Sequence, residues 1–158
     1  MNNHSNEPAN LLEAERDSRR NLNQANRRRG RRWEAALRDG LRSYGFDAER
    51  LRDTGNRDEG DLVVRMSGSH VVIEAKDTAM RAGPFVDEAH LEANHFAEHR
   101  GLDVDDVEGI VIVKRRGRGF RKAFVLTTVE DYFQLPEAPL PKPASGPVHR
   151  LAGAGGAG

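Results

Sequence analysis

The sequence contains no cysteine among its 158 residues. Disulfides and thiolate metal sites are therefore excluded, although this absence does not define a cellular compartment. The sequence also lacks an apolar run long enough to cross a membrane, and its polar N-terminus does not have the pattern of a signal peptide. We therefore expect no membrane partner and a cytoplasmic location, in the host cytoplasm if the chain is encoded by a phage.

The chain also lacks net charge, so it has no overall attraction to nucleic acid. Its charges are nevertheless segregated. Residues 16–32 contain eight arginines and one acid, and residues 114–122 contain six basic residues and no acid. The compensating acids lie elsewhere, notably in residues 103–108. Segregation of this kind steers a polyanion toward the basic segments.

Composition divides the chain into three parts. Residues 1–26 are rich in asparagine and charge, which predicts a flexible basic arm with at most a transient helix. Residues 136–158 are rich first in proline and then in glycine and alanine, which predicts a disordered tail. One folded domain is expected over residues 27–135, long enough to bury a core.

Apolar periodicity and turn residues predict alternating helices and strands in the folded domain. The predicted elements are a helix over 31–44, a strand over 46–52, a hairpin over 60–76, a helix from Pro84 to Gly101, strands over 109–113 and 123–126, and a helix over 128–133. This order predicts an α/β fold with a mixed central β-sheet flanked by helices.

The hairpin contains the most informative residues of the chain. Two apolar runs, Gly60–Val64 and Val71–Lys76, flank the polar segment Ser67–His70. Apolar runs bounded by turn residues predict two paired strands. If the loop is this whole polar segment, or its two inner residues, Asp61 lies directly opposite Lys76.

This pairing places Asp61, Glu74 and Lys76 on one face of the hairpin. Asp61 and Glu74 are then diagonal neighbours about 7–8 Å apart, which is close enough for both to bind one metal ion. The opposite face is apolar and is expected to face the core, through Leu62, Val64, Ile73 and Ala75.

A purely structural interpretation of the hairpin is the alternative. Asp61 would then cap a turn, and Glu74 with Lys76 would form the solvated face of an edge strand. The matched positions of the acids across the hairpin favour a functional site, as do the continuously apolar runs typical of central strands.

The order of these residues resembles the motif of the PD-(D/E)XK nuclease superfamily. Glu34 lies on the first helix, Asp61 begins a strand, and Glu74 and Lys76 follow on the next strand. Gly60 stands where the motif has proline, a variation that does not touch the chemistry.

Within that superfamily the chain most resembles the archaeal and phage Holliday junction resolvases. Arg29-Gly30 precedes Glu34 in a basic stretch, and Thr54-Gly55 precedes the strand aspartate. The resemblance covers about residues 27–133. It implies a restriction-endonuclease-like core and an endonuclease that cuts DNA.

The resemblance also implies a role for each motif residue. Glu34, Asp61, Glu74 and Lys76 would be catalytic, and the metal ligands would be Asp61, Glu74 and the carbonyl of Ala75. Phosphodiester hydrolysis needs a neutralised phosphate and a hydroxide near neutral pH, and a hard divalent cation bound by carboxylates supplies both. We therefore expect Mg²⁺ as the cofactor, with Mn²⁺ able to substitute. For Glu34 the alternative is an ordinary helical ion pair with Arg38.

The basic segments are the predicted DNA-binding surface, since lysine and arginine side chains neutralise phosphates. Ordinary solvated arms or turns are the alternatives for each segment. The candidate DNA-binding residues are Arg27, Arg28, Arg29, Arg31, Arg32, Thr54, Asn56, Arg115, Arg116, Arg118 and Lys122.

Three histidines lie on the helix that begins near Pro84: His90, His95 and His99. His95 and His99 have the spacing of a zinc pair, but no further ligand pattern accompanies them. A surface or DNA-facing position is the better interpretation.

The leading hypothesis is a structure-selective endonuclease that resolves four-way junctions by paired symmetric nicks. Such cutting calls for a homodimer, because one domain with one acid cluster supplies one nick. A second hypothesis keeps the fold but acts on linear duplex, flaps or ends in repair or phage DNA processing. A third hypothesis is a non-catalytic DNA-binding protein. The acids argue against it, because carboxylates that face phosphate do not help a protein that only binds DNA.

Overall fold

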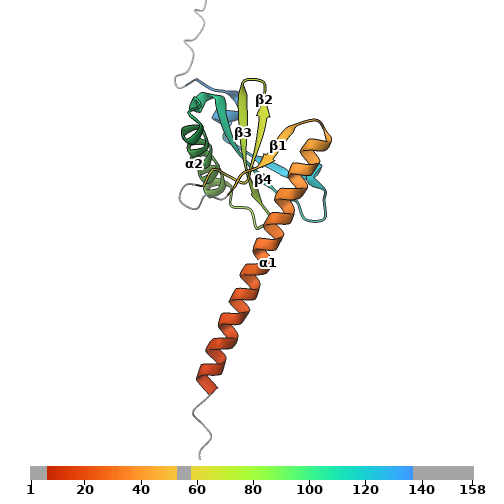
Figure 1. Ribbon diagram of the computed structural model, residues 1–158, viewed down its shortest axis with the longest axis vertical. Helices are drawn as coiled ribbons and strands as arrows, with labels where there is room; N and C mark the ends of the chain where they lie inside the picture. Colours follow the sequence, from red (N-terminus) through yellow and green to blue (C-terminus); the bar gives the residue numbers. More distant parts are fainter. Residues whose placement is uncertain (1–6, 53–57, 137–158) are drawn as a thin grey trace, which may run out of the picture. The chain divides into compact units, whose positions relative to one another are not determined.

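The computed structural model describes residues 7–52 and 58–136 (Figure 1). Residues 1–128 form one compact unit, and the remaining described residues belong to a second unit. The second unit contains the short helix α3 (Val129–Phe133). The first unit contains α1 (Glu7–Ser43), β1 (Asp47–Arg50), β2 (Leu62–Met66), β3 (Ser69–Lys76), α2 (Ala82–Arg100), η1 (Val104–Asp106), β4 (Val107–Val113), η2 (Phe120–Lys122) and β5 (Phe124–Leu126).

One five-stranded sheet forms the centre of the first unit, with its strands in the order β1-β2-β3-β4-β5. β3 and β4 are parallel and are joined by α2, whereas the other neighbouring pairs are antiparallel. The predicted α/β class, the mixed sheet and the order of the main helices and strands are confirmed. No helix of the described chain combines the length and apolarity needed to cross a membrane.

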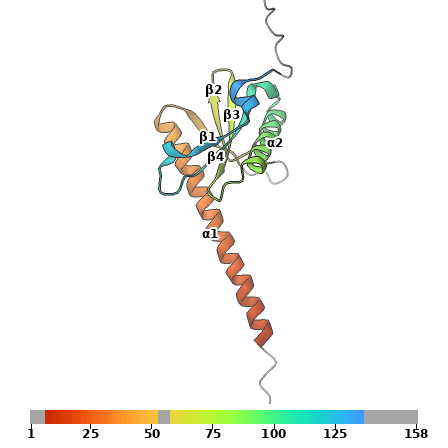
Figure 2. The ribbon, with the colours of Figure 1, turned by 180° about the vertical axis from the view of Figure 1, so that it is seen from behind.

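The C-terminal part of α1 covers one face of the sheet (Figure 2). Trp33 and Leu37 are buried there, and the indole Nε1 of Trp33 donates a hydrogen bond to the carbonyl of Ile112 at 3.2 Å. The strand residues beneath them are those predicted for the core face of the hairpin, namely Leu62, Val64, Ile73 and Ala75.

Helix α2 covers the opposite face. Phe96 is almost fully buried against Val63 and Val72, and a large apolar side chain buried in this way contributes about 1.5–3 kcal/mol. Phe85 and Ala89 pack nearer the start of the helix, against β4. The acidic face of the hairpin is therefore an internal face, and α2 lies directly over it.

The predicted hairpin register is wrong by two residues. The turn consists of Ser67 and Gly68, and Met66 pairs with Ser69. Gly68 takes a positive φ of 86°, which glycine adopts without steric cost, so a two-residue turn lies one residue earlier than expected and each pairing shifts by two residues. Asp61 consequently lies across from Glu74 rather than Lys76. A shift of two residues preserves the faces, because side chains alternate with a period of two.

Helix α1 is much longer than the predicted helix over 31–44. It begins at Glu7, although the side chains of residues 13–29 are all exposed. A helix without a buried face has no apolar periodicity, which explains why the pattern did not predict this part. Two apolar residues within the predicted helix, Ala36 and Tyr44, are exposed as well.

Several sequence predictions fall on residues outside the described ranges. These include the DNA-binding roles of Thr54 and Asn56 and nearly all of the predicted disordered tail. The predicted flexibility of residues 1–26 stays a prediction.

A glycine on β4 brings α2 close to the sheet. A Cβ atom on Gly109 would lie 2.5 Å from the carbonyl oxygen of Ala89 and 3.0 Å from the Cβ of Ala93. Only hydrogen fits in this space, so the backbones of β4 and α2 approach more closely than any side chain permits.

We predict that Gly109→Ala destabilises the protein by about 1–3 kcal/mol, because the backbone of α2 must shift to relieve the overlap. Gly119→Ala is the matched control, since its Cβ meets nothing within 4 Å and its φ of −71° suits any residue. The control should be neutral or slightly stabilising. Urea unfolding of the two variants measures both effects, and equal stabilities would contradict the close packing.

Candidate active site

Asp61 and Glu74 lie side by side at one end of the central strands. The main-chain N–H of Asp61 donates to the carbonyl of Ile73 at 3.1 Å, and its carbonyl accepts from Leu51 at 2.9 Å. These bonds place Asp61 in line with β2, directly ahead of its first residue. Its side-chain Oδ2 accepts a hydrogen bond from the backbone N–H of Ala75 at 2.9 Å. The carboxylate is thereby turned across the hairpin toward Glu74.

Lys76 lies on the same face as Glu74, as predicted. Its ammonium contacts the carboxylate of Glu74 and lies 2.7 Å from Oε2 of Glu88 on α2. The ammonium also lies 5.3 Å from the ring centroid of Phe85. Burial acts to lower the pKa of Lys76, but the bonds to both glutamates outweigh it, and the pKa is raised. The side chain is therefore a cation at neutral pH.

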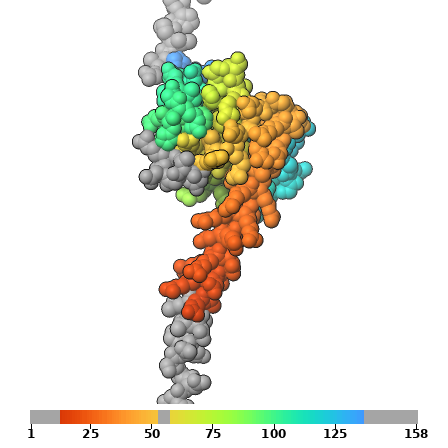
Figure 3. Space-filling model, in the orientation of Figure 1, coloured from red at the N-terminus to blue at the C-terminus, as the bar shows by residue number. Residues whose placement is uncertain are grey.

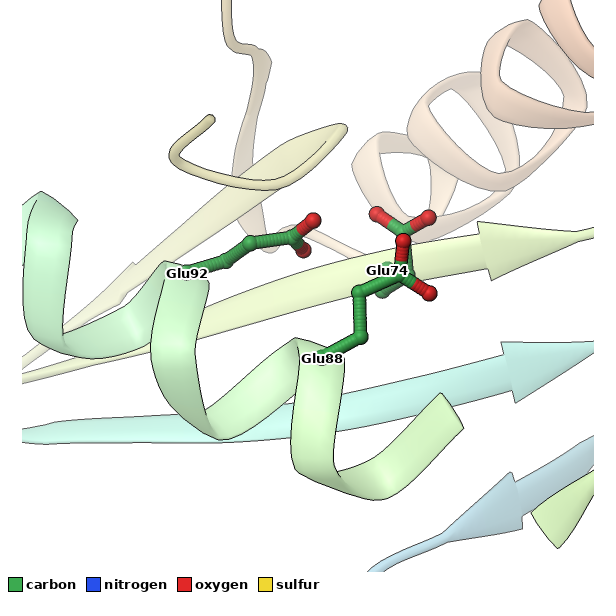
Figure 4. A group of neighbouring side chains, drawn as sticks. All are labelled: Glu74, Glu88 and Glu92. Carbon is green, nitrogen blue, oxygen red and sulfur yellow. The ribbon is translucent and has the colours of Figure 1, made fainter. Parts of the chain in front are cut away.

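Helix α2 adds two acids that the sequence analysis missed. Glu88 and Glu92 point from α2 toward Glu74 on β3, and ligand oxygens of the three residues lie within 4.8 Å of one another (Figure 4). Glu92 is buried, and its Oε2 has no hydrogen-bond partner among the described residues. A signal was present in the sequence, because Glu92 follows Ala89 by three residues and precedes Phe96 by four on the inward side of α2.

Crowded carboxylates raise one another's pKa values. Burial, the charge of Glu74 and the charge of Glu34 raise the pKa of Asp61 to about 8. Burial and the charge of Glu92 raise the pKa of Glu74 to about 7, against the opposing effect of Lys76. Burial and the charges of Asp58 and Glu88 raise the pKa of Glu92 to about 7. The site therefore has more negative charge than its own lysine neutralises.

Glu34 reaches this region from α1, as predicted, although its partner differs from the predicted alternative. Its carboxylate accepts a hydrogen bond from the guanidinium of Arg50 on β1, whereas Arg38 pairs with Asp39. Glu34 and Asp61 open onto one pocket of about 590 Å³, lined by Arg27, Gly30, Arg31, Glu34, Arg50, Leu51, Asp58, Gly60 and Asp61.

The structure separates the predicted arginine cluster into different sides of α1. Arg27 and Arg31 line the pocket that contains Glu34 and Asp61. Arg28 lines a neighbouring hollow along the helix. With 3.6 residues per turn, Arg29 and Arg32 lie on the side opposite Glu34. Two of the five arginines thus lie at the pocket.

Residues next to the strand aspartate are held by the C-terminal turn of α2. The side chain of Glu59 is buried and bonds to His99 and, at 2.6 Å, to Arg100. Burial acts to raise the pKa of Glu59, but these two bonds outweigh it and lower the pKa. The Nδ1 atom of His95 lies 3.0 Å from the carbonyl of Asp58. His95 and His99 therefore position the segment ahead of the strand aspartate.

Gly60 has a structural role that the motif comparison did not reveal. Its φ is +86°, a conformation that proline cannot adopt and that other side chains rarely adopt. A Cβ at this position would lie 2.8 Å from Val72 and 3.5 Å from Oε2 of Glu92. The glycine therefore permits the positive φ and leaves room for the side chain of Val72 beside the acid cluster.

The second basic segment forms the connection between β4 and β5. Its cationic side chains from Arg115 onward are exposed, and the segment turns at Arg115–Arg118, where Gly117 has a φ of +70°. Phe120 anchors the connection against α1, since a Cβ on Gly40 would lie 2.7 Å from its ring. The candidates Arg115, Arg116, Arg118 and Lys122 are thus presented to solvent.

Comparisons with known proteins are sparse. No family model matches the chain, and no curated protein matches it. Among solved structures, the chain is similar to a Holliday junction resolvase from the archaeal hyperthermophile Archaeoglobus fulgidus. The sequences are 22% identical, the match covers 57% of this chain and 67% of that chain, and the TM-score is 0.39. The function is therefore argued from the site itself.

Proposed function

We propose that this protein is a divalent-metal-dependent DNA endonuclease that resolves four-way junctions. One observation supports this proposal above the others: the carboxylates of Asp61, Glu74 and Glu92 crowd at one end of the sheet, beside a cationic lysine. Arginines of α1 line the adjoining pocket. Carboxylates that bind a cation next to arginines that bind phosphate are the components of phosphodiester hydrolysis.

The acid cluster fits a hard divalent cation. Its donors are carboxylate oxygens, the ligands that Mg²⁺ and Mn²⁺ prefer, and the buried Oε2 of Glu92 lacks a partner in the described structure. Asp61 and Glu74 would bind the cation, with the Ala75 carbonyl and the two acids of α2 as further ligands. When bound, the cation neutralises phosphate charge and makes hydroxide accessible near neutral pH.

The protein's own cations act on the substrate in complementary ways. Arg27 and Arg31 are placed to bind phosphates beside the acid cluster, which positions the backbone for cleavage. Lys76 is cationic, so it stabilises negative charge that develops at the phosphate and orients the attacking water. Lys76 is paired with Glu74 and Glu88, so it can contact the phosphate and the water only when another cation neutralises these two acids.

Two other functions are the alternatives. A nuclease acting on linear duplex, flaps or ends would use the same residues, and only its substrate would differ. A non-catalytic DNA-binding protein would have no use for carboxylates whose pKa values are raised by mutual repulsion beside a phosphate-binding pocket.

We predict Mg²⁺-dependent cleavage of a synthetic four-way junction in preference to a flap or a linear duplex. Asp61→Asn and Glu74→Gln should each abolish cleavage, because each removes a metal ligand, while DNA binding persists or tightens because a charge that repels phosphate is lost. Gel assays of cleavage and binding separate these effects. Loss of binding in parallel with cleavage would indicate a structural role for the acids.

We predict that the metal-free protein becomes less stable as the pH rises from 6 to 8.5. The folded protein keeps protons on carboxyls whose pKa values are about 7 to 8, whereas the unfolded chain has already released them above its ordinary values near 4. The folded state therefore binds more protons in this window, and its stability falls with pH. Thermal unfolding in EDTA measures the trend.

Adding Mg²⁺ should raise the melting temperature most at pH 8.5, because ligands that have lost their protons bind the cation best. Asp61→Asn is the control, since the neutral amide should reduce both the pH dependence and the gain from Mg²⁺. A melting temperature that rises with pH in EDTA would contradict the charged cluster.

We predict a two-fold homodimer, because paired nicks across a junction need two equivalent sites. Exposed apolar side chains are available, with Phe124 at 44% and Val125 at 59% exposure on β5. In the second unit Val129, Tyr132 and Phe133 are exposed. Sedimentation at micromolar concentration gives the mass. A monomer that nicks only one strand would favour the flap or linear-duplex nuclease.

A further inference from the structure

Four arginines form a continuous row along α1 that ends at the candidate active site. Arg16, Arg20, Arg27 and Arg31 follow one another at intervals of four, seven and four residues, and Glu34 comes next. With 3.6 residues per turn, these intervals keep all five on one side of the helix. We call the four basic residues the arginine stripe.

The surface hollows along α1 show the same continuity. The outermost hollow is lined by Arg16 and Arg20 together with the acids Glu13 and Asp17. A second is lined by Arg20, Arg27 and Arg31, together with Asn23 and Gln24. The active-site pocket in turn shares Arg27 and Arg31. Each hollow shares at least one arginine with the next, so the arginines run continuously along the helix, and the two acids lie at the outer end only.

The part of α1 that presents most of the stripe buries no side chain. Figures 1 and 3 show its N-terminal part projecting beyond the sheet, and the side chains of residues 13–29 are all exposed. From residue 18 to residue 32 there are seven arginines and no acid. Such an exposed, self-repelling helix is costly by itself, and a polyanion along its length removes the repulsion.

The composition of the helix decides between possible partners. Leu22 is the sole large apolar side chain from residue 13 to residue 32. This part of the helix therefore lacks the row of apolar residues that a coiled coil needs and the apolar face that inserts into a membrane surface. Asp17 lies 3.9 Å from Arg20, but both side chains are exposed, and such a pair is worth little beside a phosphate contact. Charge complementarity favours a nucleic-acid backbone.

The reach of the stripe from Glu34 gives the length of that backbone. The 18 residues that separate Arg16 from Glu34 rise about 27 Å at about 1.5 Å each. Duplex DNA rises about 3.4 Å per base pair, so the outer end of the stripe lies about eight base pairs from Glu34. The inner end of the stripe lies beside the acid cluster, so these base pairs extend outward from the scissile phosphate.

We infer that the arginine stripe binds the phosphate backbone of a duplex DNA arm over about eight base pairs outward from the cleavage site. This inference rests on the proposed nuclease function and adds a requirement for arm length. A junction with shorter arms leaves Arg16 and Arg20 without phosphates. Substrate selection then depends on the duplex beyond the branch point as well as on the branch itself.

The test compares two double variants that remove equal charge. Arg16→Gln/Arg20→Gln shortens the stripe at its outer end, whereas Arg29→Gln/Arg32→Gln alters the other side of the same helix. Binding of fluorescent four-way junctions with hairpin-closed arms of 6, 10 and 16 base pairs is measured by anisotropy in EDTA. Cleavage plays no part in this assay, so its result is separate from the failure or success of the nuclease proposal.

The affinity of wild type should be higher for junctions with the longer arms than for the junction with the shortest arms. Arg29→Gln/Arg32→Gln should show the same gain in affinity, and Arg16→Gln/Arg20→Gln should lose it. On the 16-base-pair arms the log–log salt slope should fall by about 1.8 in Arg16→Gln/Arg20→Gln. Between 50 and 200 mM salt, wild type should then lose about tenfold more affinity than that variant. Thermal unfolding confirms that both variants fold.

Three results would overturn the inference. Equal loss of the arm-length gain in both double variants would show a diffuse charge effect without a stripe. An unchanged gain in Arg16→Gln/Arg20→Gln would show that the outer helix does not reach DNA. Binding to phosphatidylserine vesicles that depends on Arg16 and Arg20 and exceeds junction binding would assign the stripe to a membrane surface.

Discussion

Repulsion among buried carboxylates is the constraint on which the rest of the site depends. The pKa values of Asp61, Glu74 and Glu92 are all raised, because burial and the charges of neighbouring acids disfavour the ionised form of each carboxyl. A folded protein tolerates such a cluster only when protons or cations neutralise it. Lys76 supplies one positive charge and Arg50 supplies another to Glu34, which still leaves a surplus. A divalent cation is the natural complement of that surplus, and the proposed nuclease chemistry depends on it.

Packing on both faces of the sheet enforces this repulsion. α1 and α2 cover opposite faces, and each contributes acids toward the same end of the strands. Gly109 permits α2 to approach the sheet, and Gly60 leaves space for the side chain of Val72 next to the acids. The apolar contacts of Phe96 and Leu37 thus offset the cost of bringing like charges together. Stability and function oppose each other at this site, as they often do at catalytic centres.

Many features of the fold and the site were predictable because they depend on local pattern. Apolar runs bounded by turn residues predicted the strands, and the alternation of side chains placed Asp61, Glu74 and Lys76 on one face. That assignment survived an error of two residues in register, since parity alone determines the face. The register itself depended on whether Gly68 or Ser69 sits at the second turn position, and composition does not distinguish these choices.

Other features had no local pattern to reveal them. Glu92 occupies an inward position of α2, but a glutamate among apolar residues becomes informative only when the helix is known to face Glu74. The outer half of α1 buries nothing, so it leaves no hydrophobic periodicity in the sequence, and its helical form was missed. His95 and His99 have the spacing of a zinc pair, yet the structure turns them to the segment that contains Asp58 and Glu59.

The sequence by itself determined the class of fold, the order of its main elements and the acids and lysine at the ends of two strands, because these follow from residue type and alternation along the chain. Tertiary structure alone decided which further acids join them, which arginines line the pocket, and which partners orient Glu34 and Glu59. The reason is physical. Local pattern determines which way a side chain points from its own element, whereas burial, charge repulsion and pKa depend on side chains brought together from distant parts of the chain.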